Sequence, residues 1–171
     1  MENEKKKKFT IQKMCMTAVF MALTCMATAF IQIPIPLGYA HLGDCIILIA
    51  AYLCGPVAGA LAGGIGSAMA DVITGFAIWA LPTLLIKTIM PIIAYLLFRK
   101  MKITIGAAVS LLFMVVGYVG FGCILYGGVA AGLSSAPGLL LKAVVNFAIF
   151  RVVALGVKKS GLKAAVGKLL G

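Results

Sequence analysis

Three basic residues, Lys87, Lys142 and Arg151, lie inside long apolar stretches. A charge within such a stretch is costly and usually faces a partner or a cavity. Asn146 follows Lys142 by four residues, so both side chains project from one face of a helix. Arg151 falls on the opposite face, near a helix end, which favours an anchor at the membrane surface. Lys87 and Lys142 are therefore candidates for binding a polar small molecule; a structural pair with Asp71, or contacts with backbone carbonyls, is the alternative.

Two other polar side chains share the helix face of Lys87. Thr83 and Trp79 precede that lysine at successive four-residue steps, which places all three on one side of a helix. An aromatic residue at this depth is also typical of the belt at the membrane–water interface. We interpret the three as one wall of a binding site, with the interfacial role as the alternative for Trp79.

The first two apolar runs are separated by a polar stretch, Ile33 to Asp44, that contains the single histidine of the chain. Its two prolines fix φ and disfavour helix at the preceding residues, so residues 33–36 should be extended. Tyr39, His41 and Asp44 then lie together in a loop at a membrane surface. We interpret this loop as a lid over a small-molecule site; a connector with an aspartate helix cap is the alternative.

The composition defines a polytopic membrane protein. Of the 171 residues, 63% are hydrophobic and 11% are charged, well below the charge content of a soluble domain. A spanning helix needs about 20 apolar residues, so five or six spans fill the chain and leave no room for a soluble catalytic domain. The five cysteines lack CxxC spacing and a nearby histidine, so we expect neither a metal site nor a disulfide framework.

The apolar runs predict an all-α bundle of six membrane helices in a single domain, residues 1–171. The second run is too short to cross the membrane as a straight helix, the third is rich in glycine, and the fourth should be bent or broken at Pro82 and Pro91. Residues 71–75 and 127–138 read as connectors, 1–8 as a cytoplasmic tail, 34–44 as the extracellular lid and 158–171 as a cytoplasmic amphipathic tail. The runs cover about 9–33, 45–54, 57–73, 79–98, 103–126 and 139–157.

Twelve of the fifteen basic residues form three clusters: before or within the start of the first run, between the fourth and fifth, and after the sixth. Six passes put all three clusters on one side, which the positive-inside rule identifies as the cytoplasm. We therefore expect both termini inside a bacterial plasma membrane. The net charge of +11 indicates topology and contact with anionic lipid, and it gives no reason to expect nucleic-acid binding.

These features together resemble the substrate-binding S component of energy-coupling factor (ECF) vitamin importers. The similarity covers nearly the whole chain and is most specific in three places: Ala18 and Ala22, which match an AxxxA motif in the first helix; the sequence IPIPLGYAHLGD from Ile33 to Asp44; and the glycine-rich segment 55–66. The resemblance implies a six-helix bundle that holds its substrate near the outer face. The loop after helix one would cap that site, and helices four to six would line it.

The resemblance also implies the partners and the working parts. Such a subunit has no ATPase and no catalytic residues, binds no covalent cofactor, and docks through Ala18 and Ala22 on a transmembrane coupling subunit driven by two cytoplasmic ATPases. The expected ligand is a water-soluble vitamin or precursor: pyridoxine or hydroxymethylpyrimidine is favoured, and riboflavin and thiamine are alternatives. The residues that match the expected substrate site are Tyr39, His41 and Asp44 in the cap, Trp79, Thr83 and Lys87 on helix four, and Lys142 and Asn146 on helix six.

Two other classes of function stay open. A self-sufficient secondary transporter or small channel would need a coupling-ion site or a repeat, and only Asp44 and Asp71 are acids at membrane depth. An integral-membrane enzyme would need a catalytic pair, an HExxH motif or a P-loop, and the sequence contains none of these. Any dependence on ATP must therefore be supplied by partner subunits.

Overall fold

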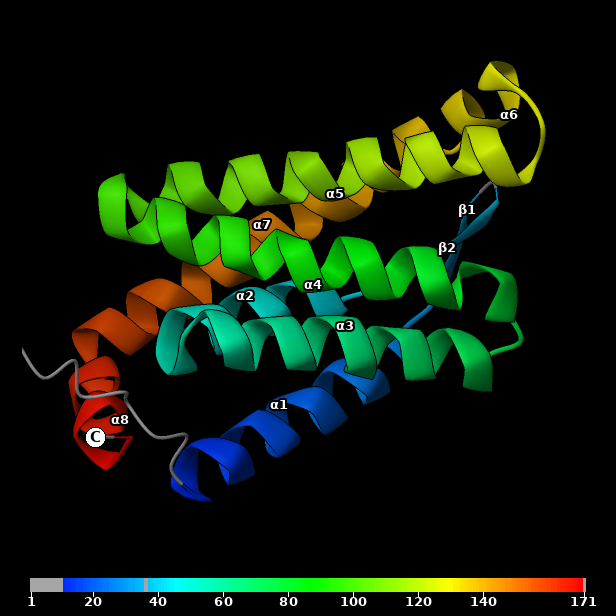
Figure 1. Ribbon diagram of the computed structural model, residues 1–171. Coiled ribbons are helices and arrows are strands. Elements are labelled where there is room, and N and C mark those ends of the chain that lie inside the picture. Colours follow the sequence, from blue (N-terminus) through cyan, green and yellow to red (C-terminus); the bar gives the residue numbers. More distant parts are fainter. Residues whose placement is uncertain (1–10, 36, 171) are drawn as a thin grey trace, which may run out of the picture.

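The computed structural model describes residues 11–35 and 37–170 as a helical bundle with one small hairpin (Figure 1). Each of the six apolar runs forms a helix, and the boundaries differ from the expected ones by a few residues. The elements, in chain order, are α1 (Ile11–Phe30), β1 (Ile33–Ile35), β2 (Gly38–Ala40), α2 (Gly43–Cys54), α3 (Pro56–Ile73), α4 (Ala77–Lys100), α5 (Ile103–Leu125), α6 (Val129–Ser134), α7 (Ala136–Lys159) and α8 (Leu162–Leu169).

Five stretches within the described part of the chain are long and apolar enough to cross a membrane: α1, α3, α4, α5 and the α6–α7 segment. Helix α2 has 12 residues, which corresponds to about 18 Å at 1.5 Å per residue. That length is short of the roughly 30 Å hydrocarbon core. The expected bundle with a short second helix is therefore what the chain forms.

Helix α3 packs against α1, α2 and α4, and its buried glycines explain how three helices approach it closely. A Cβ atom added at Gly66 would lie 2.6 Å from the carbonyl oxygen of Met21 on α1. A Cβ atom at Gly59 would lie 2.8 Å from the Ala51 Cβ on α2 and 2.9 Å from the Pro91 Cβ on α4. Small residues at such contacts permit the backbone approach that holds membrane helices together.

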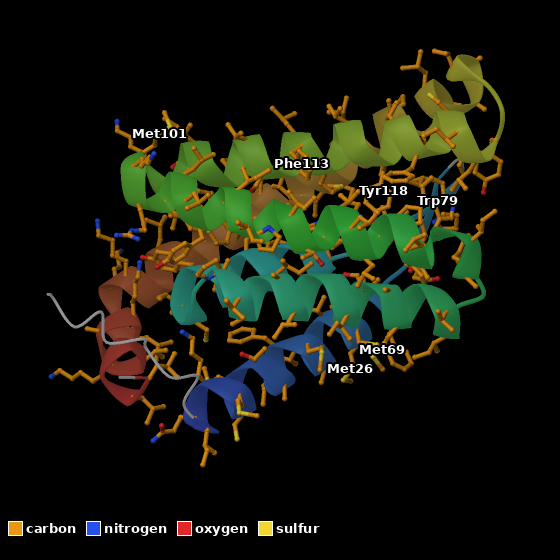
Figure 2. All side chains as sticks on the ribbon, in the orientation of Figure 1. Met26, Met69, Trp79, Met101, Phe113 and Tyr118 are labelled. Atoms are coloured by element: carbon orange, nitrogen blue, oxygen red, sulfur yellow. The ribbon has the colours of Figure 1, made fainter. Side chains whose placement is uncertain are left out.

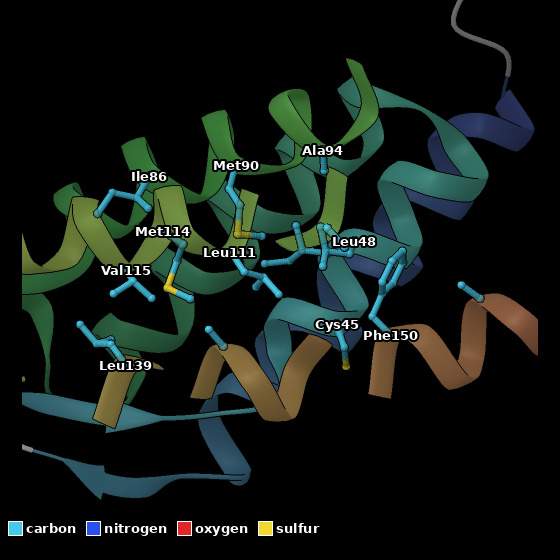
Figure 3. Packing of buried hydrophobic residues seen from close by; sticks show 14 residues of the cluster. Cys45, Leu48, Ile86, Met90, Ala94, Leu111, Met114, Val115, Leu139 and Phe150 are labelled. Carbon is cyan, nitrogen blue, oxygen red and sulfur yellow. The ribbon is translucent and has the colours of Figure 1, made fainter. Parts of the chain in front are cut away.

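The main apolar core lies between α2, α4, α5 and α7 (Figure 3). Leu48, Met90, Met114 and Phe150 contribute one buried side chain from each of these helices, and none is measurably exposed. In the close-up these side chains converge from the surrounding ribbons into one cluster. This core fixes the ends of α4, α5 and α7 relative to the hairpin, which is the region where the polar residues gather.

The two ends of the bundle differ in character. The hairpin, α6 and the α3–α4 turn lie at one end, and the α4–α5 turn, the end of α7 and α8 lie at the other (Figure 1). The second end carries the basic residues of the α4–α5 turn and of α7 and α8, so it is the cytoplasmic end by the positive-inside rule. Helix α8 folds back there, with Val166 packed against Cys54 and Ala58.

Four expectations need correction. Of the expected bend or break at Pro82 and Pro91, the break is wrong: helix α4 is continuous through both prolines, because neighbouring helices support the backbone of a membrane helix at proline. The expected connector 127–138 contains α6 and the first turn of α7, and the first residues of the expected connector 71–75 belong to the end of α3. The expected lid pairs with itself as a two-stranded hairpin, and its last two residues, 43 and 44, begin α2.

Candidate functional site

The loop after α1 folds into an antiparallel hairpin in which Ile33 pairs with Ala40, Pro34 with Tyr39 and Ile35 with Gly38. Leu37 turns the chain with a φ of 62°, a left-handed conformation that is uncommon outside glycine. The hairpin packs against the start of α7, where a Cβ added at Gly138 would lie 2.7 Å from an Ile35 side-chain atom. The segment expected to be a lid is thus a hairpin that packs against the outer end of the bundle.

Beneath the hairpin lies a cavity with an empty volume of about 450 Å³, part of it open to solvent. Its walls combine aromatic, aliphatic and polar side chains from the hairpin, α3, α4, α5 and α7. Figure 2 shows Trp79 and Tyr118 at this end of the molecule, on α4 and α5. The lining residues are Ile35, Leu37, Tyr39, His41, Asp71, Phe76, Trp79, Thr83, Tyr118, Ser135, Leu139 and Lys142.

One side of the cavity is formed by a contact between the lid and α3. The Tyr39 hydroxyl donates a hydrogen bond of 2.5 Å to Oδ1 of Asp71, and the Tyr39 ring lies 4.9 Å from that of Phe76. Burial raises the pKa of Tyr39 above its ordinary value of 10.0, and the charge of Asp71 raises it further. The hydroxyl therefore stays protonated across the physiological pH range and remains able to donate the hydrogen bond to Asp71.

The other side is formed by His41 and Lys142. Lys142 Nζ lies 3.0 Å from His41 Nε2, while Nδ1 accepts a hydrogen bond of 3.0 Å from the Gly43 amide. His41 lies in the link between the hairpin and α2, outside the spanning helices. Burial lowers its pKa well below 6.5, and the charges of Lys142 and Lys87 lower it further. The imidazole is therefore neutral at physiological pH.

Three buried charges adjoin this wall. Asp44, at the start of α2, forms an ion pair through Oδ1 with Lys87 Nζ. Its second oxygen, Oδ2, lies 3.3 Å from Lys142 Nζ. Asp44 and Lys87 are fully buried, and a buried charge is tolerated when it is paired. One carboxylate therefore serves two ammonium groups, which ties α2, α4 and α7 together near the cavity.

Asn146 joins α7 to α2 and to the link that precedes α2, through backbone groups. Its Nδ2 donates 2.9 Å hydrogen bonds to the carbonyl oxygens of His41 and Lys142, and its Oδ1 accepts one of 2.9 Å from the Cys45 amide. The side chain is fully buried. Asn146 thus holds the lid link and the first turn of α2 against α7.

An aromatic wall completes the cavity. The rings of Trp79 and Tyr118 are 5.7 Å apart, and the Trp79 indole N–H donates to the Tyr126 hydroxyl at 3.3 Å. The hydroxyl groups of Thr83 and Tyr118 lie 2.9 Å apart. Nζ of Lys142 is 5.3 Å from the centroid of the Tyr118 ring, within the range of a cation–π contact. Flat rings beside fixed polar groups suit a flat, polar ligand.

The structure brings together the residues that the sequence singled out, in two groups. Tyr39, His41, Trp79, Thr83 and Lys142 line the cavity. Three others that were also expected to contact the ligand do not line the cavity: Asp44, Lys87 and Asn146. They lie behind its wall, in contact with lining residues or with one another. A ligand contact by any of the eight stays a prediction.

Sequence reasoning missed several lining residues. Asp71 was interpreted as part of a connector or as a partner for a lysine, and it lines the cavity instead. The signal was present, because Asp71 is one of only two acidic residues beyond residue 4. Phe76, Tyr118 and Ser135 carried no such signal, since apolar stretches and loops commonly contain these residue types.

The fold and the site together define a multi-pass membrane protein with a polar, aromatic cavity under a hairpin at its outer end. Comparison with known families identifies which kind it is. Residues 8–159 match the family described as the ECF-type riboflavin transporter, S component. The match spans most of the sequence, and the chain belongs to this family. It is therefore a non-enzymatic transport subunit of the plasma membrane.

One curated protein is similar to a large part of this chain. The chain is 41% identical over 108 residues to an uncharacterized protein in a gap 3′ region of Pyrococcus woesei. The aligned part covers 60% of this chain and 72% of the relative. S components work with a transmembrane coupling subunit and ATPase subunits, which agrees with the expected dependence on partners.

Proposed function

We propose that this S component captures a vitamin with a planar heteroaromatic ring in the cavity beneath the lid. A dedicated or shared module of one coupling subunit and two ATPases then drives import. The observation that carries the proposal is the pairing of an aromatic wall, Trp79 and Tyr118, with polar groups on both sides of the same cavity. Such a site stacks a ring and fixes its edges by hydrogen bonds.

Two kinds of vitamin fit this description, each for its own reason. The family description favours riboflavin. The lysine and asparagine four residues apart on α7, Lys142 and Asn146, favour a smaller polar ring compound such as pyridoxine or hydroxymethylpyrimidine. Thiamine, with two linked rings, is the remaining alternative.

The identity of the ligand is tested by extraction from the purified chain. We expect mass spectrometry of the protein, isolated in mild detergent, to find one vitamin at near-stoichiometric amount. Titration of ligand-free protein with riboflavin, pyridoxine, hydroxymethylpyrimidine and thiamine then ranks the candidates. Absence of binding to all four, by a protein that elutes as a single species, would contradict the proposal.

The placement of the site is tested by a pair of variants on α7. Lys142 lines the cavity, whereas Arg151 lies nine residues further along the same helix. Lys142→Met should weaken binding of the extracted vitamin, because loss of a charged partner costs about 1–3 kcal/mol. That loss corresponds to roughly ten- to a hundred-fold in Kd. Arg151→Met is the matched control and should bind as the wild type; equal losses in both variants would contradict the assignment.

A further inference from the structure

The charges around the cavity balance. Two ammonium groups, Lys87 and Lys142, face two carboxylates, Asp44 and Asp71. Asp44 pairs with both lysines. Asp71 lies on the opposite side of the cavity, beside Tyr39. His41 between them is neutral, because burial and the adjacent lysines hold its pKa low. With both lysines and both carboxylates in their ionised forms and His41 neutral, the site without its ligand carries no net charge, although charged groups line two of its sides.

The carboxylate of Asp71 is not fully used by the protein. Its Oδ1 accepts the Tyr39 hydrogen bond, while Oδ2 is buried and has no hydrogen-bond partner among the described residues. The nearby Thr83 hydroxyl, which also approaches Asp71, lies 2.9 Å from the Tyr118 hydroxyl. Asp71 is only 5% exposed, and a buried carboxylate oxygen without a partner is unfavourable. A ligand that donates a hydrogen bond to Oδ2 would remove this deficit.

The opposite side offers the complementary group. Lys142 Nζ lines the cavity and shares Asp44 with Lys87. An ammonium group has three donors, and Asp44 engages Lys142 at the longer distance of 3.3 Å. Lys142 is thus able to donate to an acceptor on the ligand. The cavity presents an acceptor on one side and a donor on the other.

We propose that the ligand of this site carries no net charge, presents a donating or cationic edge to Asp71 and presents an accepting or anionic edge to Lys142. Unphosphorylated heteroaromatic vitamins meet this condition. Pyridoxine does so as a zwitterion with a protonated ring nitrogen and an ionised ring hydroxyl, and riboflavin does so as a neutral molecule that has both N–H donors and oxygen and nitrogen acceptors. Their phosphate esters do not, since a dianion would leave a site of balanced charge with an uncompensated negative charge. This inference rests on the proposed function.

The test compares each vitamin with its own phosphate ester. Calorimetric titration of the purified wild-type chain uses two pairs: pyridoxine with pyridoxine 5′-phosphate, and riboflavin with riboflavin 5′-phosphate. For the pair whose vitamin binds, we expect the ester to bind at least a hundred-fold more weakly. An ester that binds as tightly as its vitamin overturns the charge-balance inference and leaves the proposed function intact. If neither vitamin nor ester of either pair binds, this inference is overturned.

Two variants then ask whether charge is the cause. Asp71→Asn leaves the site with a surplus positive charge, so the ratio of ester Kd to vitamin Kd should fall at least tenfold. Lys142→Gln leaves a surplus negative charge, so the ratio should rise or the ester should bind undetectably. Each ratio is measured within one variant, so a general loss of affinity cancels. An unchanged ratio in Asp71→Asn, with the ratio of Arg151→Met as the control, would overturn the role of Asp71.

Discussion

At the scale of single residues, Asp44 has the largest structural role at the site, because it is shared by Lys87 and Lys142. Asp44→Asn leaves both ammonium groups without a carboxylate, and breaking a buried pair costs about 3–5 kcal/mol. Lys87→Met should cost less, since Asp44 keeps Lys142. Thermal unfolding of the two variants in the same detergent measures the difference. A larger loss in Lys87→Met than in Asp44→Asn would contradict the shared-carboxylate arrangement.

His41 supplies a pH dependence. Its pKa is held well below 6.5 by burial first, and then by Lys142 and Lys87; the Tyr39 ring also faces it at 5.7 Å. Below about pH 6.5 the unfolded chain therefore binds more protons at this position than the folded one does, so stability falls as the pH drops and is fully present above that value.

The pH dependence is measured by comparing thermal unfolding at pH 7.5 and pH 5.5. We expect the wild type to lose stability between these values and His41→Gln, which does not titrate, to lose less. Other groups titrate equally in both proteins, so the difference between the two slopes belongs to His41. Equal slopes would show that the imidazole is already accessible to protons in the folded state.

The sequence predicted the polar residues of the site better than the apolar ones. Lys87, Lys142 and Asp44 were detectable because a charge inside an apolar run needs a partner. The pairing of both lysines with the single carboxylate of Asp44 could not be predicted, since it depends on the relative rotation of α2, α4 and α7. Tyr118 could not be predicted for a different reason. The sequence does not show whether an aromatic residue in an apolar span faces a cavity or the lipid.

At the scale of elements, the lid hairpin is held down by side chains at both of its ends. The Tyr39–Asp71 hydrogen bond is its contact with α3. Tyr39→Phe removes that bond and leaves the ring contact with Phe76 in place. A hydrogen bond to a charged group contributes about 1.5–3 kcal/mol, so we expect dissociation of the bound vitamin to be roughly ten- to a hundred-fold faster.

Stopped-flow measurement of vitamin release checks this expectation. Tyr95→Phe makes the same chemical change on α4, well away from the cavity, and should release the vitamin at the wild-type rate. If Tyr39→Phe also released at the wild-type rate, the hairpin would be a connector rather than a lid.

Secondary structure followed from the sequence wherever an apolar run was long. Helices α3, α4, α5 and α7 begin and end within a few residues of the expected positions. The hairpin was foreseen only as an extended stretch, because its pairing depends on the backbone conformation of Leu37 and on support from α7. The short helix α6 was missed, since its residues, mostly glycine, alanine and serine, read equally well as a loop.

At the scale of the whole molecule, the predicted docking strip lies on α1, which contributes no residue to the lining of the cavity. Its buried threonines, Thr17, Thr24 and Thr28, face inward, and α1 packs on α3 and α2. Ala18 and Ala22 lie on its exposed side. The cavity at the outer end is formed by the hairpin, α3, α4, α5 and α7 with no lining residue from α1. The predicted binding site and the predicted docking strip therefore lie on different surfaces of one bundle.

That separation leads to a prediction about α1. Ala18 and Ala22, four residues apart, form a smooth strip on which another helix approaches closely, and contacts in lipid depend on such fit. We expect the double variant Ala18→Leu/Ala22→Leu to bind the vitamin with wild-type Kd, because the cavity is untouched. It should nevertheless fail to retain the coupling subunit in a pull-down and fail to support uptake. Ala148→Leu, a matched change on the exposed side of α7, should retain both activities.

Reconstitution in liposomes gives the decisive comparison. With the coupling subunit and ATPases present, wild type and Ala148→Leu should concentrate the vitamin on addition of ATP, and Ala18→Leu/Ala22→Leu should not. Uptake by the double variant at the wild-type rate would show that the partner docks elsewhere. Concentrative uptake by the wild-type chain alone would instead support a self-sufficient secondary transporter, in which case Asp44 and Asp71, the two acids at membrane depth, would be the first candidates for a coupling-ion site.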